Sequence, residues 1–493
     1  MKKSIIIFLF ITLIVAQTRQ IPADTTVVTK HKTTIRGKKV DYKATTGTQP
    51  VWNEDGSPIA AVHYTYYERT DIKKDPSRPI MISFNGGPGS GSVWMHLAYT
   101  GPMILNVDDE GFPVQPYGVK SNPHSILDVA DIVFVNPVNT GFSRILDKET
   151  KKETFFGVNA DIAYLAEWIN TFIQRVNRWE SPKYLIGESY GTTRVSGLAA
   201  ALQGRQWMYI NGVILVSPTE LGIDAGNGRR SGPLGAALRL PYFTAAAWYH
   251  DKLPRDLQRK DLLEVLDEAE DYAINELIAV IAKGGFIEER ERKKAAATMA
   301  RYSGISEESI LSYNLDVPTS FYWKELLREE GYTVGRLDSR YKGLDKTKGG
   351  VRPDFNSELT SWLHSFTPAI NYYYKNILKF ETDVKYNMFG PVSPWDNKNN
   401  NTGENLRQAM AQNPYLHTMI QSGYYDGATK YFDAKYTMWR IDPSGRMKER
   451  LSFKGYRSGH MMYLRNEDLK LSNDDIRSFI IKSTPKKGAP AKY

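Results

Sequence analysis

Short, almost entirely apolar runs in the first half of the chain constrain its fold more than any other feature. They lie at residues 80–84, 132–135, 184–186 and 213–216. Runs of this length are typical of strands that are buried on both faces of a parallel sheet. Apolar residues recur at helical spacing from Ile162 to Val176, and residues 193–202 can form the next helix. Because strands and helices alternate, the sequence predicts an α/β protein with a doubly wound, mostly parallel central sheet flanked by helices.

The pattern of the chain changes near residue 226. Longer and more charged helical stretches follow, and strand-like runs return at 416–420 and 451–454. An α/β core often grows by insertion in this way, and an inserted helical cap can shape a pocket over the sheet. The expected organisation is a signal peptide at 1–16, a first core part at 20–225, a helical cap insertion at 226–384, a second core part at 385–482 and a disordered tail at 483–493.

The N-terminal residues have the composition of a secretory signal peptide. Lys2 and Lys3 precede an apolar run from Ile5 to Ala16. A transmembrane helix would need about 20 apolar residues, so we expect cleavage near Ala16, export, and no membrane span in the mature protein. Residues 21–51 are polar and threonine-rich.

Composition excludes several classes of function. The chain has no cysteine, which rules out disulfides, thiol catalysis and cysteine-ligated metals, and which fits bacterial export to the periplasm or medium. Its net charge is +9, and the basic residues are interleaved with acidic ones, as in the stretch 288–294. Such a pattern is typical of a solvated helix face, so we expect no nucleic-acid partner. No metal-ligand cluster has usable spacing, and the sequence predicts no cofactor.

A candidate nucleophile lies between the third apolar run and the helix that follows it. Residues 187–191 read Gly-Glu-Ser-Tyr-Gly and match the pattern G-x-S-x-G. Between a strand and a helix, this pattern makes a strained turn that lifts the serine hydroxyl to the top of the sheet. A purely structural turn is the alternative. We therefore predict that Ser189 is the nucleophile of an α/β-hydrolase fold.

A serine nucleophile needs a base and an acid, which follow it in that fold in the order acid, then histidine. His460 follows a strand-like run in a loop, whereas the remaining candidates, His250, His364 and His417, fall in the helical insertion or inside an apolar strand. A surface histidine is the alternative role. Asp426 lies in a glycine-flanked turn just past the run 416–420, where it could orient the imidazole. Asp433, within the next predicted helix, is the fallback.

The glycine-rich loop 85–89 follows an early strand, where hydrolases of this type supply one backbone donor to an oxyanion. The residue after the nucleophile, Tyr190, supplies the other. A phosphate-binding loop is the competing interpretation, but no Lys-Ser or Lys-Thr follows as in a P-loop.

Five segments, in this order, resemble the serine carboxypeptidase family over most of the chain outside the insertion. They are Asn85–Gly89, Asn136–Ser143, Gly187–Gly191, Gly423–Asp426 and Gly459–Met461. The resemblance implies a Ser189–His460–Asp426 triad and oxyanion donors at Gly87 and Tyr190. It also implies that Asn85 and Glu188 recognise the free C-terminus of a peptide substrate. The chain departs from the family at Ser83 and Ser90, where members commonly have Trp and Cys, and it lacks the usual proline after His460.

The resemblance has a consequence for Glu188. A carboxyl group beside a bound carboxylate is expected to be protonated, because like charges at hydrogen-bonding distance raise the pKa of one of them. We therefore predict peptide hydrolysis that is favoured at acidic pH; a satisfied structural carboxylate is the alternative role of Glu188. An esterase or acyltransferase with the same triad and a non-catalytic binding protein are the alternative functions.

Overall fold

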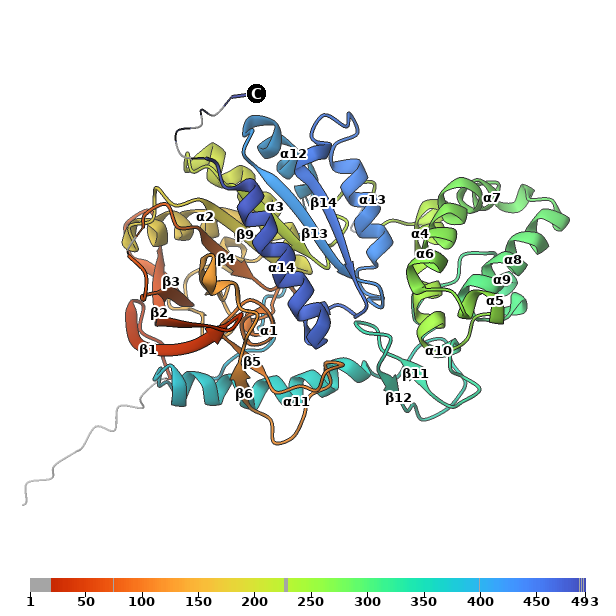
Figure 1. The fold of residues 1–493 in the computed structure, drawn as a ribbon, viewed down its shortest axis with the longest axis horizontal. Coiled ribbons are helices and arrows are strands. Elements are labelled where there is room, and N and C mark those ends of the chain that lie inside the picture. The colour runs from red at the N-terminus through yellow and green to blue at the C-terminus, as the bar shows by residue number, and fades with distance from the viewer. Residues whose placement is uncertain are drawn as a thin grey trace, which may run out of the picture.

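The computed structural model describes residues 19–493 except 74, 226–228, 399, 487, 489 and 491 (Figure 1). The predicted signal peptide lies outside the described residues. None of the helices in the described part of the chain has both the length and the apolar character that a bilayer span requires.

A mixed sheet forms the centre of the molecule (Figure 1). Six neighbouring strands run parallel to one another: β7, β4, β9, β10, β13 and β14. The strands β1, β2 and β3 extend the sheet antiparallel, and β8 (Arg144–Ile145) pairs with β3. The order across the sheet is β1 (Thr25–Ile35), β2 (Lys38–Trp52), β3 (Pro58–Arg69), β7 (Asp131–Val135), β4 (Ile80–Phe84), β9 (Lys183–Glu188), β10 (Gly212–Val216), β13 (His417–Gly423) and β14 (Leu451–Tyr456). The α/β class that the alternating elements predict is confirmed.

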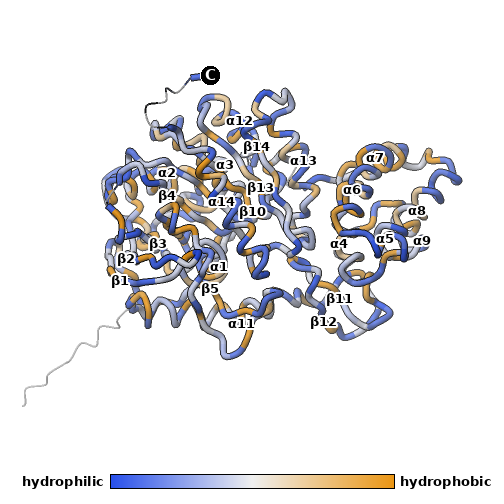
Figure 2. The backbone as a smooth tube through the Cα atoms, in the orientation of Figure 1, coloured by the Kyte–Doolittle hydropathy of each residue, from blue (hydrophilic) through white to orange (hydrophobic). Residues whose placement is uncertain are grey.

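Alternate residues of the central strands face two separate apolar cores. In β7, Val133 and Val135 pack on one side, and Ile132 and Phe134 pack on the other. The first core contains α2 (Val158–Arg175), α3 (Tyr190–Arg205) and α12 (Thr402–Gln412). The second contains α1 (Val93–Ala98), α11 (Ser357–Tyr372) and α14 (Asn466–Ser483). Because both faces are covered, the strands read as continuous apolar runs, and Figure 2 shows the same concentration of hydrophobic residues around them.

A helical lobe stands beside the sheet between β10 and α11 (Figure 1). It has its own apolar core. A small hairpin of β11 (Thr333–Val334) and β12 (Lys342–Gly343) follows the lobe in the chain. The helices of the lobe are α4 (Gly232–Tyr249), α5 (Arg255–Gln258), α6 (Leu262–Tyr272), α7 (Ile278–Ala282), α8 (Glu289–Ser303), α9 (Glu307–Ser312) and α10 (Thr319–Glu325). The remaining strands and α-helices are β5 (Met103–Leu105), β6 (Val119–Ser121) and α13 (Tyr431–Ile441).

The threonine-rich segment that the sequence pattern left unassigned forms the long hairpin of β1 and β2. Exposed and less exposed residues alternate along most of β1, because only one face of this edge strand packs against the core. The turn between the two strands has positive φ angles at Arg36 (48°) and Gly37 (76°). That conformation matches the twist of adjacent strands. Abundant threonine, a β-branched residue, and the Arg-Gly pair were the signals that could have identified this hairpin.

Candidate active site

A sharp turn places Ser189 between β9 and α3. Its backbone angles are φ 57° and ψ −126°, a conformation that is strained for a residue with a side chain. Two glycines make the turn possible, since a Cβ at Gly187 would overlap the carbonyl oxygen of Gly191. The half-exposed Ser189 lines a cavity of about 340 Å³ at the carboxyl end of the parallel strands.

His460 and Asp426 meet beside this cavity, although the chain separates them. Asp426 follows β13, and His460 follows its parallel neighbour β14. Nδ1 of His460 lies 2.6 Å from Oδ2 of the fully buried Asp426. The other carboxylate oxygen accepts hydrogen bonds from the amides of Ala428 at 2.8 Å and Thr429 at 3.1 Å. With a proton on Nδ1, the ring donates to Asp426 and keeps Nε2 free as an acceptor.

The surroundings of His460 raise its pKa above the usual value. Burial alone lowers this pKa because it penalises the imidazolium, but the charge and hydrogen bond of Asp426 and the charge of Glu188 outweigh burial. The charge of Arg336 acts in the same direction as burial. An imidazolium at this position is therefore stabilised chiefly by Asp426.

Ser189 and His460 line the same cavity. Among the described residues, Ser189 Oγ makes no hydrogen bond with the imidazole ring. The fallback acid, Asp433, lies in α13, where it forms ion pairs with Lys430 at 2.8 Å and Arg230 at 3.4 Å. It therefore belongs to a different cluster. The other histidines that the sequence offered lie outside the described lining of the cavity: His250, His364 and His417.

The tip of the β11–β12 hairpin joins the two loops that follow β13 and β14. The amide of His460 donates to the carbonyl of Leu337 at 2.7 Å, and the amide of Gly427 donates to the carbonyl of Arg336 at 3.0 Å. Glu358, in the first turn of α11, accepts a hydrogen bond from the Leu337 amide at 2.8 Å. Burial raises the pKa of Glu358 to about 7. No local sequence pattern marks this contact, because it joins segments that are distant in the chain.

The glycine-rich loop after β4 packs against the turn at Ser189. A Cβ at Gly86 would lie 2.5 Å from the amide nitrogen of Tyr190. The next residue, Gly87, has a φ of 104°, which favours glycine. As the first residue of α3, Tyr190 has an N–H without an acceptor inside the helix. Gly87 and Tyr190 line the cavity together with Ser189.

A buried ion pair holds the glycine-rich loop after β4 in place. Arg194 of α3 pairs with Asp161 of α2 at 2.7 Å, and their side chains are 0% and 1% exposed. The same guanidinium donates to the carbonyls of Asn85 at 2.6 Å and Pro88 at 3.4 Å. The pair thereby ties two helices to the loop that carries Asn85 and Gly87.

Glu188 lines the same cavity and is held by two neutral donors. The side-chain amide of Asn85 donates to Oε2, and the hydroxyl of Tyr463 donates to Oε1 at 2.6 Å. Burial raises the pKa of Glu188 to about 7, although the charge of His460 and both hydrogen bonds act in the opposite direction. Below neutral pH the carboxyl group is therefore mostly protonated, and it can donate a hydrogen bond of its own.

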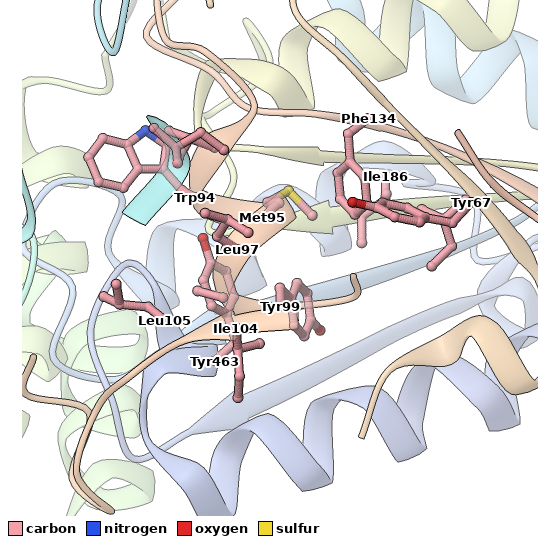
Figure 3. Packing of buried hydrophobic residues seen from close by; sticks show 14 of the residues in the cluster. Tyr67, Trp94, Met95, Leu97, Tyr99, Ile104, Leu105, Phe134, Ile186 and Tyr463 are labelled. Carbon is pink, nitrogen blue, oxygen red and sulfur yellow. The ribbon is translucent and has the colours of Figure 1, made fainter. Parts of the chain in front are cut away.

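Two aromatic residues of this site were not predicted from the sequence. Tyr463, three residues after His460, stacks on Tyr99 with ring centroids 4.5 Å apart (Figure 3). Trp94 lines the cavity, and its Nε1 donates to Oγ of Ser90 at 2.7 Å. Ser83, where the resemblance leads us to expect Trp, is buried in β4. An indole from α1, that of Trp94, therefore lines the cavity. Its closeness to the glycine-rich loop was the signal that could have identified it.

Part of the chain is similar in sequence to known proteins. Residues 37–260 match the family model described as serine carboxypeptidase. Serine carboxypeptidase-like 36 of Arabidopsis thaliana is 28% identical over 170 residues, which are 33% of this chain and 32% of the plant protein. A carboxypeptidase Y homolog of Arthroderma benhamiae is 29% identical over 154 residues, 30% of this chain and 28% of that protein. The chain thus spans about a third of the length of the relatives it matches, and these matches support the family.

A solved structure shows the same fold over a longer stretch. It is the crystal structure of Kex1(delta)p, a prohormone-processing carboxypeptidase from Saccharomyces cerevisiae. The TM-score is 0.52 at 14% sequence identity, and the match covers 89% of this chain and 91% of the yeast chain. The α/β-hydrolase fold is therefore confirmed.

Proposed function

We propose that this chain, whose residues 37–260 match the serine carboxypeptidase family, removes C-terminal residues from peptides through an acyl-enzyme. One observation carries the proposal. A buried carboxyl group with a pKa of about 7, Glu188, lines the same cavity as Ser189 and His460. In protonated form it can donate a hydrogen bond to the free carboxylate of a peptide, and Asn85 holds it in place. A protonated acid in this position favours substrates that end in a carboxylate.

The roles of the triad follow from the hydrogen bonds at His460. In the reaction, Oγ of Ser189 comes within hydrogen-bonding distance of Nε2 of His460, which takes its proton as Oγ attacks the scissile carbonyl carbon. The amides of Gly87 and Tyr190 stabilise the negative charge on the carbonyl oxygen. When the C–N bond breaks, the imidazolium gives its proton to the leaving amine. A water molecule then attacks the acyl carbon with His460 again as base, which releases the shortened peptide and restores Ser189.

A comparison of matched substrates tests the proposal. We expect an N-blocked dipeptide with a free C-terminus to be hydrolysed at least about tenfold more efficiently, in kcat/KM, than its C-terminal amide, because a neutral amide loses a charge-assisted hydrogen bond. The ethyl ester of the same blocked amino acid serves as the control. Ester turnover without dipeptide turnover would contradict the proposal and indicate the alternative, an esterase or acyltransferase with the same triad.

The pH dependence of binding should follow Glu188. Below about pH 7 the protonated carboxyl binds the substrate carboxylate, and above it the ionised group repels the substrate. KM should therefore rise as the pH increases through 7, whereas kcat should fall in acid as His460 takes up a proton. Together these limbs give a bell-shaped profile of kcat/KM with its optimum close to neutrality, on the acid side of the pH at which KM rises. A KM that stays constant between about pH 5 and pH 8 would contradict this role of Glu188.

Replacing Tyr463 with phenylalanine provides a matched test of the same carboxyl group. The hydrogen bond from Tyr463 lowers the pKa of Glu188, so its removal should raise that pKa and move the rise in KM to higher pH. A merely structural tyrosine would change the thermal midpoint without moving the pH at which KM rises. The ring stacked on Tyr99 is retained in the phenylalanine variant.

We also propose that the protein is exported after cleavage near Ala16. The proposal rests on the basic and apolar pattern of residues 1–16. Its bacterial character rests on the absence of cysteine alone, because the relatives named above come from a plant and a fungus. Sequencing the N-terminus of protein recovered from the medium or periplasm of the producing cell tests this. An intact Met1 would contradict it.

A further inference from the structure

Two arginines line the active-site cavity and have no ion-pair or side-chain hydrogen-bond partner in the described part of the chain. Arg336 comes from the tip of the β11–β12 hairpin, and Arg229 follows β10. Among the described residues, neither guanidinium forms an ion pair or a side-chain hydrogen bond. Arg336 is half-buried, whereas Arg229 is exposed. A guanidinium is a planar, bidentate donor that suits a carboxylate, so an Arg336 that lines a cavity without a hydrogen-bond partner indicates a ligand of that kind.

The position of Arg336 connects it to the reacting groups. The carbonyl of the next residue, Leu337, accepts the amide of His460 at 2.7 Å, and the carbonyl of Arg336 accepts the amide of Gly427 at 3.0 Å. Two backbone hydrogen bonds therefore fix the arginine relative to the loops that carry Asp426 and His460. Its charge is also close enough to act on the pKa of His460.

The rest of the cavity suits a ligand that is partly apolar and negatively charged. Glu188 is the only acidic residue among its described lining residues, and it is mostly neutral in acid. In a cleft with low-dielectric walls, two unpaired cations concentrate anionic ligands. The apolar part of the lining consists of Trp94, Leu337, Leu359, Trp362, Phe389 and Met461.

We propose that the enzyme prefers peptides with an acidic side chain next to the scissile bond, which Arg336 binds through its guanidinium. Arg229, at the more exposed part of the lining, adds to the positive field that attracts such peptides. This inference rests on the proposed carboxypeptidase function and specifies its substrate class. The C-terminal carboxylate is bound separately, by Glu188.

Pairs of substrates that differ only in charge test the inference. They are blocked Ala-Glu against blocked Ala-Gln, and blocked Glu-Ala against blocked Gln-Ala, which place the acid on either side of the bond. At about pH 6 the substrate glutamate is ionised, since its unperturbed pKa is about 4.3, while Glu188 is still mostly protonated. For at least one pair we expect kcat/KM about 10- to 100-fold higher for the glutamate member.

Variants of Arg336 assign the preference to this residue. Arg336→Gln should remove most of the preference and leave turnover of the glutamine substrate within a few-fold of wild type. Arg336→Lys should retain part of the preference. Arg336→Glu should invert the preference, so that a blocked dipeptide with lysine in place of the glutamate becomes the better substrate. Arg259→Gln changes an exposed arginine outside the described cavity lining and should leave the preference intact.

Equal turnover of the glutamate and glutamine substrates by the wild type would overturn the inference and leave the proposed function standing. An equal loss on both substrates in Arg336→Gln would also overturn it, because the arginine would then act on the common C-terminal carboxylate or on the fold. If no blocked dipeptide is hydrolysed, the proposed function fails and the inference fails with it.

Discussion

Replacing Ser189 with alanine is expected to lower kcat for a blocked dipeptide by about 10⁴- to 10⁶-fold. The alanine variant has no oxygen to form the acyl-enzyme, so His460 and Asp426 have no nucleophile to activate. Substrate binding should change little, because Glu188, Asn85 and the oxyanion amides are unaltered. The strained turn should also tolerate the change, since alanine keeps the Cβ that serine already carries there. Steady-state kinetics together with the thermal midpoint measure both effects.

The chain offers a matched control in the same helix. Ser196 of α3 is buried, and its Oγ has no hydrogen-bond partner among the described residues. Ser196→Ala should therefore retain nearly full activity. An organophosphonate should label the wild type once and Ser189→Ala not at all. Labelling of the alanine variant, or dipeptide turnover close to that of the wild type, would exclude Ser189 as nucleophile, and an unlabelled, inactive wild type would indicate a non-catalytic binding protein.

Replacing Asp161 with alanine is expected to lower the free energy of unfolding by about 3–5 kcal/mol. The substitution leaves the guanidinium of Arg194 buried, fully charged and without its carboxylate, since arginine does not deprotonate in proteins. Burial raises the pKa of Asp161 and Arg194 limits that rise, so the charge of this buried carboxylate depends on the arginine. Because Arg194 also holds the carbonyls of Asn85 and Pro88, kcat/KM should fall as well.

Two further variants separate this effect from a general loss of packing. Asp161→Leu combined with Arg194→Met removes both charges, and it should recover a large part of the lost stability. Asp24→Ala breaks the exposed pair with Arg175, whose side chains are 46% and 38% exposed, and it should cost less than about 1 kcal/mol. Urea unfolding measures all three. An Asp161→Ala variant as stable as Asp24→Ala would show that the buried pair contributes little.

Local sequence patterns predicted the elements that depend on local chemistry. Ile80–Phe84 was predicted as a strand with the bounds that the structure has, because an apolar run can be buried on both faces of a parallel sheet. The helix predicted from Ile162 onward begins earlier, at Val158, because its first turn lies beyond the clearest apolar spacing. Residues 25–52 were left unassigned because half of a solvent-facing hairpin is polar, and composition there resembles a loop.

The site divides in the same way. Ser189, His460 and Asp426 lie in short motifs at strand ends, so position along the chain was enough to predict them, whereas Asn85 and Glu188 were predicted from the family resemblance. Tyr463 and Arg336 do not stand in such motifs. Tyr463 reaches Glu188 because the loop after β14 returns to the end of β9, and Arg336 reaches the cavity because a hairpin from beyond the helical lobe bonds to the triad loops.

By itself the sequence determined the alternation of strands and helices, the strained turn at Ser189 and the order of acid and histidine after it, because each depends on residues that are neighbours in the chain. A raised pKa of Glu188 was predicted from a neighbouring substrate carboxylate, but only the tertiary structure showed that burial raises it and which charges line the cavity. Burial and electrostatic interactions depend on distances in space, and the groups that set them lie on segments that only folding brings together.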